Sequence, residues 1–239
     1  MIHWRPAVSE QSTLSIPSYI HDWFVQLPTR NLASEIHPKS TAIFSSDVIN
    51  GFCHFGPLAS DRVNALIGPI VDLFTRAHGL GVTEFVLLQD AHEPDAPEFG
   101  AWPPHCVRGT PEARTIPELL DLPFADLFTV VEKNSLHPGH ETEFDAWLEE
   151  HPEIRTAIVV GDCTDLCVYT LAMHLRLISN ARNIPDVRVI VPANAVDTYD
   201  LSPEAAAAIG AFPHPGQFFH EVFLYHMALN GIEVVRELG

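Results

Sequence analysis

The stretch at residues 156–180, TAIVVGDCTDLCVYTLAMHLRLISN, joins an apolar run to a helical pattern through a short turn. Residues 156–161 are mostly apolar and β-branched, which is typical of a strand covered on both faces. Gly161 permits the turn, and Thr164 or Asp165 is placed to cap the helix expected at 165–180. A buried strand that leads directly into a helix is the repeating unit of a parallel α/β sheet.

The same alternation of strand and helix continues on both sides of this stretch. Short runs rich in Val, Ile and Phe predict further strands at 41–49, 84–89, 128–132, 187–191 and 231–235. Periodic stretches between them predict helices at 60–78, 141–151, 202–210 and 217–230. The predicted fold is therefore a three-layer α/β/α domain with a six-stranded, mostly parallel sheet, in which ligands bind at the carboxyl ends of the strands.

Composition limits the classes of function. The 239 residues are 46% hydrophobic and 18% charged, which indicates one globular domain. Asp and Glu number 31 against 13 Lys and Arg, and a net charge of −18 disfavours binding to nucleic acid or to anionic membranes. The sequence contains no apolar run of membrane-spanning length and no secretory signal pattern, so we expect a cytoplasmic protein with four free thiols.

Residues 1–40 differ in pattern from the rest of the chain. They contain four prolines and only one short amphipathic stretch, near 19–26. We therefore expect an N-terminal arm at 1–40 that lies over a domain at 41–239.

Four side chains that can carry chemistry follow predicted strands. Asp47, Asp90 and Lys133 stand at or just beyond strand ends, and Cys167 opens the helix after the strand at 156–161. The fold brings such positions to one edge of the sheet. At a helix start, the unpaired amides and the helix dipole favour a thiolate, and amides of the same turn can hold an oxyanion. The alternatives are a buried thiol, or a zinc or redox pair formed with Cys163.

The long irregular segment after the second strand is a candidate metal site. Residues 90–106, DAHEPDAPEFGAWPPHC, contain Asp90 and His92 at positions i and i+2, followed by Glu98 and His105. In an extended chain, side chains two residues apart point to the same side, and imidazole with carboxylate suits zinc, iron or manganese. Asp95 competes with Glu98 for the role of second carboxylate.

These segments together resemble a known family. Asp47 in DVINGFC, the block at 90–110 that ends in WPPHCVRGT, Lys133 in VEKN, and GDCTDLCV at 161–168 resemble the nicotinamidases of the isochorismatase-like cysteine hydrolase superfamily. The resemblance runs from about residue 41 to the end of the sequence and implies the isochorismatase-like, Rossmann-like architecture. It also implies hydrolysis of nicotinamide to nicotinate and ammonia in NAD salvage, with pyrazinamide as a further substrate.

The resemblance assigns a role to each matching position. Cys167 corresponds to the nucleophile, Asp47 to the base and Lys133 to the cation beside them. The amides of Cys163 and Cys167 correspond to the oxyanion hole, with a cis peptide bond expected between Asp162 and Cys163. The remaining correspondences are metal ligands and aromatic residues that hold the pyridine ring: Asp90, His92, Glu98 and His105 for one divalent transition metal, with zinc favoured over iron or manganese, and Phe52 and Trp102 for the ring.

Some positions depart from the family pattern. Asp162 stands where an apolar residue is common, the segment at 134–147 lacks the usual short link to the next helix, and the arm has no common counterpart. Two alternatives stay open from the sequence alone. One is a metal-independent amide or carbamoyl hydrolase of the same superfamily, and the other is a catalytically silent protein that binds a metabolite. Assembly into a homo-oligomer is compatible with either function.

Overall fold

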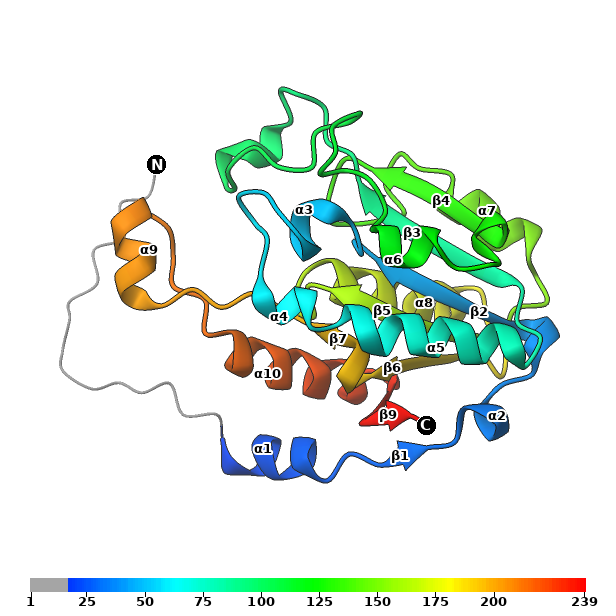
Figure 1. Ribbon diagram of the computed structural model, residues 1–239. Helices are drawn as coiled ribbons and strands as arrows, with labels where there is room; N and C mark the ends of the chain where they lie inside the picture. The colour runs from blue at the N-terminus through cyan, green and yellow to red at the C-terminus, as the bar shows by residue number, and fades with distance from the viewer. Residues whose placement is uncertain (1–16) are drawn as a thin grey trace.

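A parallel sheet with the strand order β4-β3-β2-β5-β6-β8 forms the centre of the computed structural model, which describes residues 17–239 (Figure 1). The strands of this sheet are β2 (Thr41–Ser46), β3 (Glu84–Asp90), β4 (Phe128–Lys133), β5 (Thr156–Asp162), β6 (Arg188–Pro192), β7 (Val196–Asp197) and β8 (Glu233–Val235). All of their pairings are parallel. The six predicted strands are confirmed, and the sheet gains a seventh because β7 pairs with the end of β5.

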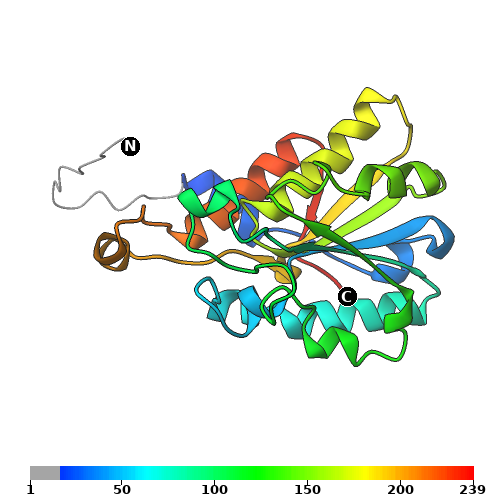
Figure 2. The same ribbon diagram turned by 90° about the horizontal axis from the view of Figure 1, so that it is seen from above.

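The helices cover both faces of the sheet. They are α1 (Ser18–Val25), α2 (Leu32–Glu35), α3 (Asn50–Cys53), α4 (Asp61–Asn64), α5 (Ile67–Gly79), α6 (Pro117–Leu120), α7 (Phe144–Glu150), α8 (Cys167–Ala181), α9 (Pro203–Ile209) and α10 (Gly216–Leu229). Short 3-10 turns lie at Pro38–Ser40, Pro97–Gly100, Ala125–Leu127 and Ala193–Ala195. Seen from above, α5 lies on one side of the sheet, and α7, α8 and α10 lie on the other (Figure 2).

Two hydrophobic clusters hold these layers together, because successive strand residues point to opposite faces. Ile43, Ile158 and Val160 pack toward Phe74 and the rest of the α5 side. Their neighbours along the strands belong to the second cluster, which also contains Leu171 of α8. Both faces of the sheet are thus buried, which explains why its strands are continuous apolar runs.

The helix predicted at 60–78 is divided into two in the structure. A turn at residues 65–66 separates α4 from α5. Pro69 lies in the first turn of α5, where its missing N–H breaks no hydrogen bond, whereas an uninterrupted helix would need that group. The break therefore follows from the position of this proline.

The described part of the predicted arm lies on the body of the protein. Trp23 of α1 packs edge-on against Tyr225 of α10, with ring centroids 5.2 Å apart. β1 (Thr29–Arg30) pairs in parallel with β9 (Glu237–Leu238) near the end of the chain. Residues 1–16 of the arm lie outside the described residues, and the division of the chain at residue 40 stays a prediction. Within residues 17–239, none of the helices has the length and apolar character needed to cross a bilayer.

Candidate active site

The sheet topology places the candidate residues at one edge. β3 and β4 extend the sheet on one side of β2, and β5, β6 and β8 extend it on the other. Successive strands are thus added outward in opposite directions from β2 and β5, and the point where the strand order reverses is where open α/β sheets form ligand sites. Gly161 allows the two strands to meet there, since a Cβ atom at this position would lie 1.9 Å from the Ser46 carbonyl oxygen.

Asp47 directly follows β2 and is almost fully buried. Its backbone takes a left-handed φ of 56°, and its Oδ1 accepts the backbone N–H of Asp90 at 2.8 Å. Ser46 Oγ donates to Asp47 Oδ2 at 3.1 Å. Burial and the Asp90 carboxylate raise the pKa of Asp47 to about 6, against the opposing effect of Lys133. Asp47 is therefore ionised at neutral pH but close to the range in which it takes up a proton.

Lys133 ends β4 and connects the candidate residues. Its Nζ lies 2.9 Å from Asp47 Oδ2, donates to Asp90 Oδ1, and lies 3.6 Å from Cys167 Sγ. Burial favours the neutral amine, but Asp47 and Asp90 outweigh it and raise the pKa of Lys133 well above its usual value. A buried ammonium thus stands between two carboxylates and a thiol.

Cys167 is the first residue of α8 and is buried. Burial raises the pKa of its thiol well above the usual value, although Lys133 opposes this. Burial therefore opposes the tendency of the helix start to favour a thiolate. The thiol needs a base to lose its proton, and the Asp47 carboxylate is the neighbouring acceptor.

The hydrogen bonds of the turn before Cys167 differ from those expected from the sequence, in which Thr164 or Asp165 was to cap the helix. Leu166, and not Thr164 or Asp165, occupies the N-cap position, and it makes no side-chain cap. Thr164 and Asp165 instead bind two histidines from the C-terminal part of the chain. Thr164 Oγ1 lies 2.9 Å from His220 Nδ1, and Asp165 Oδ2 lies 2.8 Å from His214 Nε2.

Asp162 and Cys163 begin this turn. The expected cis peptide bond between them is confirmed. Asp162 is almost fully buried, and its Oδ1 has no hydrogen-bond partner. Burial, Asp47 and Asp90 raise its pKa well above the usual value and so favour its neutral form. All four cysteines are free. Cys167 forms a compact group with Asp47 and Asp90, whereas Cys163 belongs to none of the potential metal-binding groups found among residues 17–239.

Three of the four predicted metal residues converge beside Lys133. Asp90, His92 and His105 are all buried and offer ligand atoms within 4.8 Å of one another. His92 Nε2 lies 3.3 Å from Asp90 Oδ2, and His105 Nε2 lies 3.9 Å from the same oxygen. The bridge between His92 and Val107 brings His105 back toward the strand end. Asp90 thus faces Lys133 with one oxygen and the two histidines with the other.

The hydrogen bonds of these histidines fit a metal ligand set. His92 Nδ1 lies 3.3 Å from Asn134 Oδ1, and His105 Nδ1 lies 2.8 Å from the Pro103 carbonyl oxygen. Such acceptors favour a proton on Nδ1 and leave the lone pair of Nε2 free to bind a metal. His92 Nε2 is indeed buried without a hydrogen-bond partner, although it lies near Asp90. A cation would satisfy this otherwise costly atom.

Burial distinguishes Glu98 from Asp95, the two candidates for the second carboxylate of the metal site. Glu98 is half-buried, and its Oε1 has no hydrogen-bond partner, whereas Asp95 is exposed. Burial and Asp90 raise the pKa of Glu98, which places the two carboxylates in one electrostatic environment. Glu98 lies outside the tight group formed by the other three residues. Between the two candidates, the structure favours Glu98.

The two predicted ring-binding aromatics lie in different surroundings. Phe52 of α3 is buried, and its ring centroid lies 5.7 Å from that of His105. Trp102 is partly exposed and packs edge-on against Tyr199 at 6.0 Å. Phe99 was not predicted, but its ring lies 5.5 Å from His92 and 5.7 Å from His105. Phe52 and Phe99 are thus the aromatic residues in direct contact with the histidines.

The comparison with known families agrees with this geometry. The sequence profile of the isochorismatase domain matches residues 41–219. The chain belongs to the isochorismatase family. Among members with a described activity, it is 32% identical over 215 residues to nicotinamidase 1 of Arabidopsis thaliana, covering 84% of this chain and 87% of the relative. It is 31% identical over 138 residues to nicotinamidase/pyrazinamidase of Mycobacterium tuberculosis, covering 53% of this chain and 74% of the relative.

Solved structures of the family share the fold. The nicotinamidase of Bacillus subtilis superposes with a TM-score of 0.64 at 23% identity, covering 82% of this chain and 99% of that chain. The N-carbamoylsarcosine amidase of Thermoplasma acidophilum gives a TM-score of 0.61 at 24% identity, with 82% and 96% covered. Because a nicotinamidase and an N-carbamoylsarcosine amidase share this fold, the site residues must decide the substrate.

Several site residues were missed by sequence reasoning. Asn134 follows Lys133 directly but carries no spacing signal of its own. His214 and His220 lie 49 and 56 residues from their partners Asp165 and Thr164. Their contacts depend on how α10 packs, and fourteen histidines in the chain make any single one a weak signal.

Proposed function

We propose that this member of the isochorismatase family hydrolyses nicotinamide to nicotinate and ammonia through a thioester on Cys167, in NAD salvage. The observation that carries the proposal is the position of Lys133. Its ammonium lies 2.9 Å from Asp47 Oδ2 and 3.6 Å from Cys167 Sγ and also contacts Asp90, a member of the histidine group. A nucleophile with its base thus adjoins a candidate metal site, which suits an amide attached to a ring that contains a nitrogen.

The first half of the reaction forms the thioester. Asp47 takes the proton of the Cys167 thiol, and the sulfur attacks the carbonyl carbon of the carboxamide. Lys133 stabilises the thiolate as it forms. The backbone amides of Cys163 and Cys167 are proposed to hold the oxyanion. Asp47 then returns its proton to the amide nitrogen as the C–N bond breaks, and ammonia leaves.

The second half of the reaction regenerates the enzyme. Water attacks the thioester carbonyl while Asp47 accepts a proton from it, and the C–S bond breaks. The proton returns to the Cys167 sulfur, and nicotinate leaves. An Asp47 pKa of about 6 suits both directions of transfer, since the group exchanges protons readily near neutral pH.

Asp90, His92 and His105, with Glu98 nearby, are the residues proposed to hold one divalent transition metal, with zinc favoured over iron or manganese. When bound there, such an ion would act as a Lewis acid toward the pyridine nitrogen of the substrate. Phe52 provides an apolar wall beside His105 against which the ring can lie. Trp102 is proposed as a second wall from the loop. Pyrazinamide retains the ring nitrogen and the carboxamide, so we propose it as a further substrate.

Purified protein incubated with nicotinamide tests the proposal through the release of ammonia and nicotinate. We expect Cys167→Ala to lose turnover completely, because no other group can form the thioester. Cys53→Ala is the matched control, since Cys53 is also a buried free thiol near the site, and it should retain turnover. Ammonia release by Cys167→Ala at a rate comparable to the native rate contradicts the proposal.

Metal content separates this function from its alternatives. A metal-independent amide or carbamoyl hydrolase would keep its activity after exhaustive chelation, and a silent binding protein would bind nicotinamide without releasing ammonia. We expect chelation to weaken nicotinamide hydrolysis, and benzamide, which lacks the ring nitrogen, to be a poor substrate. We also propose that the protein is cytoplasmic and that it associates with itself.

A further inference from the structure

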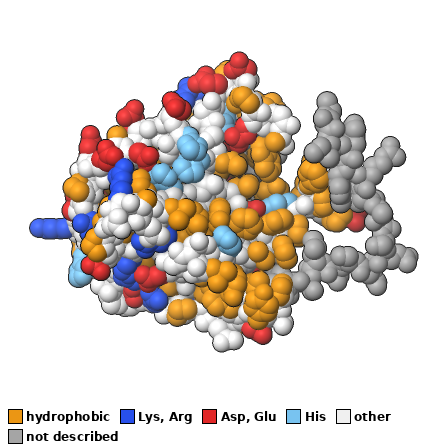
Figure 3. All heavy atoms as spheres, turned by 180° about the vertical axis from the view of Figure 1, so that it is seen from behind, with side chains coloured by type: hydrophobic (Ala, Val, Ile, Leu, Met, Phe, Trp, Pro, Cys, Tyr) orange, Lys and Arg blue, Asp and Glu red, His pale blue; other side chains and the backbone are white. Residues whose placement is uncertain are grey.

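Two helices at opposite ends of the chain pack together outside the segment that matches the family profile. The profile covers residues 41–219, so α1 lies before it and α10 from His220 onward lies after it. Tyr19 and Trp23 of α1 both contact the ring of Tyr225 in α10. Seen from behind, apolar side chains gather on the side of the molecule where these helices lie (Figure 3). α1 is thus docked on α10 by an apolar contact.

The docked helices also share a polar contact at Glu221. This side chain of α10 is fully buried, and His21 Nδ1 of α1 lies 3.1 Å from both of its oxygens. Gln217 Nε2 donates to Glu221 Oε1 at 2.7 Å. A buried carboxylate without partners is costly. Displacement of α1 would remove one of these partners, so the ion pair favours the docked position.

His220, the residue before Glu221, faces the turn that leads to the nucleophile. The ring of Phe24 in α1 packs edge-on against it, with ring centroids 5.5 Å apart. His220 is buried, and its Nδ1 lies 2.9 Å from Thr164 Oγ1. Burial lowers the pKa of its imidazole, so the ring is neutral at neutral pH and binds the hydroxyl without adding a charge. A side chain that touches α1 therefore also touches the turn.

Thr164 lies between the two proposed oxyanion donors, one residue after Cys163 and three residues before Cys167. It is fully buried, and its backbone N–H donates to the Asp197 carbonyl oxygen at 2.9 Å. The carbonyl oxygen of Cys163 accepts two N–H groups that follow in the chain, at 3.0 and 3.1 Å. These hydrogen bonds make the turn a single unit. A group that fixes the Thr164 side chain therefore fixes both amides.

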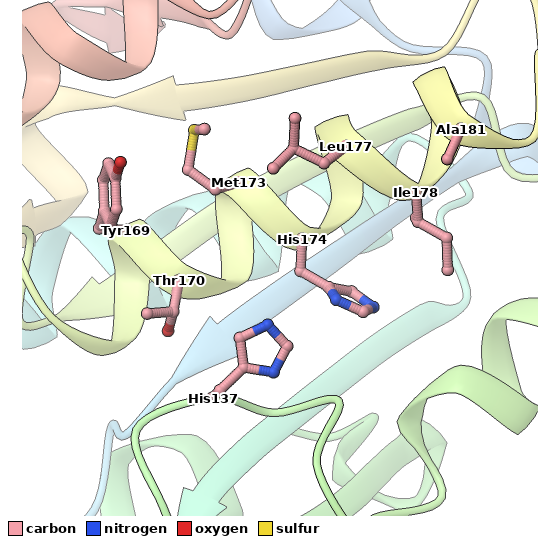
Figure 4. Close-up of a pocket in the computed structure, with 8 residues that line it drawn as sticks. All are labelled: His137, Tyr169, Thr170, Met173, His174, Leu177, Ile178 and Ala181. Atoms are coloured by element: carbon pink, nitrogen blue, oxygen red, sulfur yellow. The ribbon is translucent and has the colours of Figure 1, made fainter.

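The loop after β4 supports the start of α8 from its other side. Thr170 Oγ1 donates to the Leu136 carbonyl oxygen at 2.9 Å. Along the later turns of α8 this side opens into a hollow of about 520 Å³, with His137 opposite the helix (Figure 4). The start of α8 is thus held between two supports, namely the loop that begins after Lys133 and His220 of α10.

We propose that α1 is part of the catalytic apparatus, because it holds the positioning residue His220 against Thr164 and so fixes the amides of Cys163 and Cys167. The inference rests on the proposed thioester mechanism, which gives these amides the oxyanion. Donors to an oxyanion must be in place before the reaction, and small displacements are costly. The N-terminal segment, which lies outside the family profile, thereby acquires a role in turnover.

Steady-state kinetics of full-length variants with nicotinamide test this role. His220→Ala and Thr164→Val should each lower kcat by roughly 10- to 100-fold with a smaller change in KM, because displaced amides weaken transition-state stabilisation. His220→Asn keeps a polar group near the position of Nδ1, and Thr164→Ser keeps the hydroxyl, so both should recover part of the loss. His226→Ala is the matched control, since His226 is an exposed histidine of the same helix, and its kcat should equal that of the wild type.

A double-mutant cycle tests whether α1 acts through His220. Phe24→Ala should lower kcat at least about threefold in the wild type but have little further effect in His220→Ala, because the two residues form one connection. Asp22→Ala, at an exposed position of the same helix, should leave kcat unchanged. Thermal unfolding shows whether each variant is folded, and Phe24→Leu replaces Phe24→Ala if the latter is not. Losses that multiply in the double variant overturn the connection.

Amide hydrogen exchange over residues 163–168 is independent of the substrate. We expect at least tenfold faster exchange in His220→Ala and Phe24→Ala, because the hydrogen bonds of the turn open more often. If the wild type does not hydrolyse nicotinamide but the variants exchange faster, the proposed function fails and the positioning of the turn stands. If the wild type hydrolyses nicotinamide while folded His220→Ala and Thr164→Val retain wild-type exchange and kcat, the role of α1 and His220 is overturned and the function stands.

Discussion

The ammonium of Lys133 lies 2.9 Å from the Asp47 carboxylate, and both side chains are about 99% buried. Lys133 also contacts Asp90, and the backbone N–H of Asp90 donates to Asp47 Oδ1 at 2.8 Å. The proposed base, the proposed metal ligand and the cation thus form one buried network with two negative charges and one positive charge. A change at one member is expected to alter the ionisation of the others.

Lys133→Arg is expected to lower kcat/KM for nicotinamide by at least about 100-fold, because a planar guanidinium cannot occupy the space of a compact ammonium between three partners. Lys133→Met should also destabilise the fold by about 3–5 kcal/mol, since it leaves two buried carboxylates without a cation. Steady-state kinetics and urea unfolding measure the two effects. Lys39→Arg is the control, because Lys39 is the other lysine of the chain and is exposed. Near wild-type turnover in Lys133→Arg would remove this residue from the mechanism.

The activity is expected to fall at acidic pH because the Asp47 carboxylate becomes protonated. The base acts when deprotonated, and its pKa is raised to about 6 by burial and by Asp90. The value of kcat/KM should therefore be at its plateau above this pH and fall as the pH drops through about 6. A pH profile of nicotinamide hydrolysis measures this limb, with circular dichroism to show that the protein stays folded. A profile that is flat between pH 5 and 7 would argue against Asp47 as the base.

His214 is expected to position the turn that carries Cys163 and Cys167. It binds Asp165 at 2.8 Å and the Tyr199 carbonyl oxygen at 2.9 Å, and its ring stacks on that of Tyr199. His214→Ala should lower kcat by roughly 10- to 100-fold with a smaller change in KM, because small displacements of the oxyanion amides reduce transition-state stabilisation. His214→Gln retains a donor toward Asp165 and should recover part of the loss.

His78→Ala serves as the control for this prediction, since His78 stacks on Phe124 away from the site. Thermal unfolding of each variant separates a local effect from general instability. Equal losses in kcat for His214→Ala and His214→Gln, or a loss explained by unfolding alone, would assign His214 a purely structural role.

The sequence predicted the site where reactive side chains coincide with the ends of predicted strands or the start of a predicted helix. Asp47, Lys133 and Cys167 each stand at a strand end or helix start, so the parallel α/β pattern alone indicates that they meet. The ionisation of Cys167 could not be predicted, because a helix start favours the thiolate while burial disfavours it, and burial is known only from the packed structure. The contacts of His214 and His220 were missed for a similar reason, since they form only after α10 packs against the turn.

The last prediction concerns the metal group. Protein purified without added metal is expected to contain close to one equivalent of a divalent transition metal, measured by elemental analysis. His92→Ala and His105→Ala should lose this metal, because each removes a nitrogen that faces Asp90. Asn134→Ala should weaken metal affinity about 10- to 100-fold, since Asn134 lies 3.3 Å from His92 Nδ1 and orients the ring.

Glu98 and Asp95 provide the matched comparison for this prediction. Both are acidic residues of the same loop, but Glu98 has a buried oxygen without a hydrogen-bond partner and Asp95 is exposed. Glu98→Gln should therefore lower metal occupancy, while Asp95→Asn should leave it unchanged. Metal content is read independently of turnover, so the ligand set is tested even if nicotinamide is not the substrate. Absence of stoichiometric metal in the wild type, together with undiminished hydrolysis after exhaustive chelation, would contradict the metal site and favour a metal-independent amide hydrolase of the same fold.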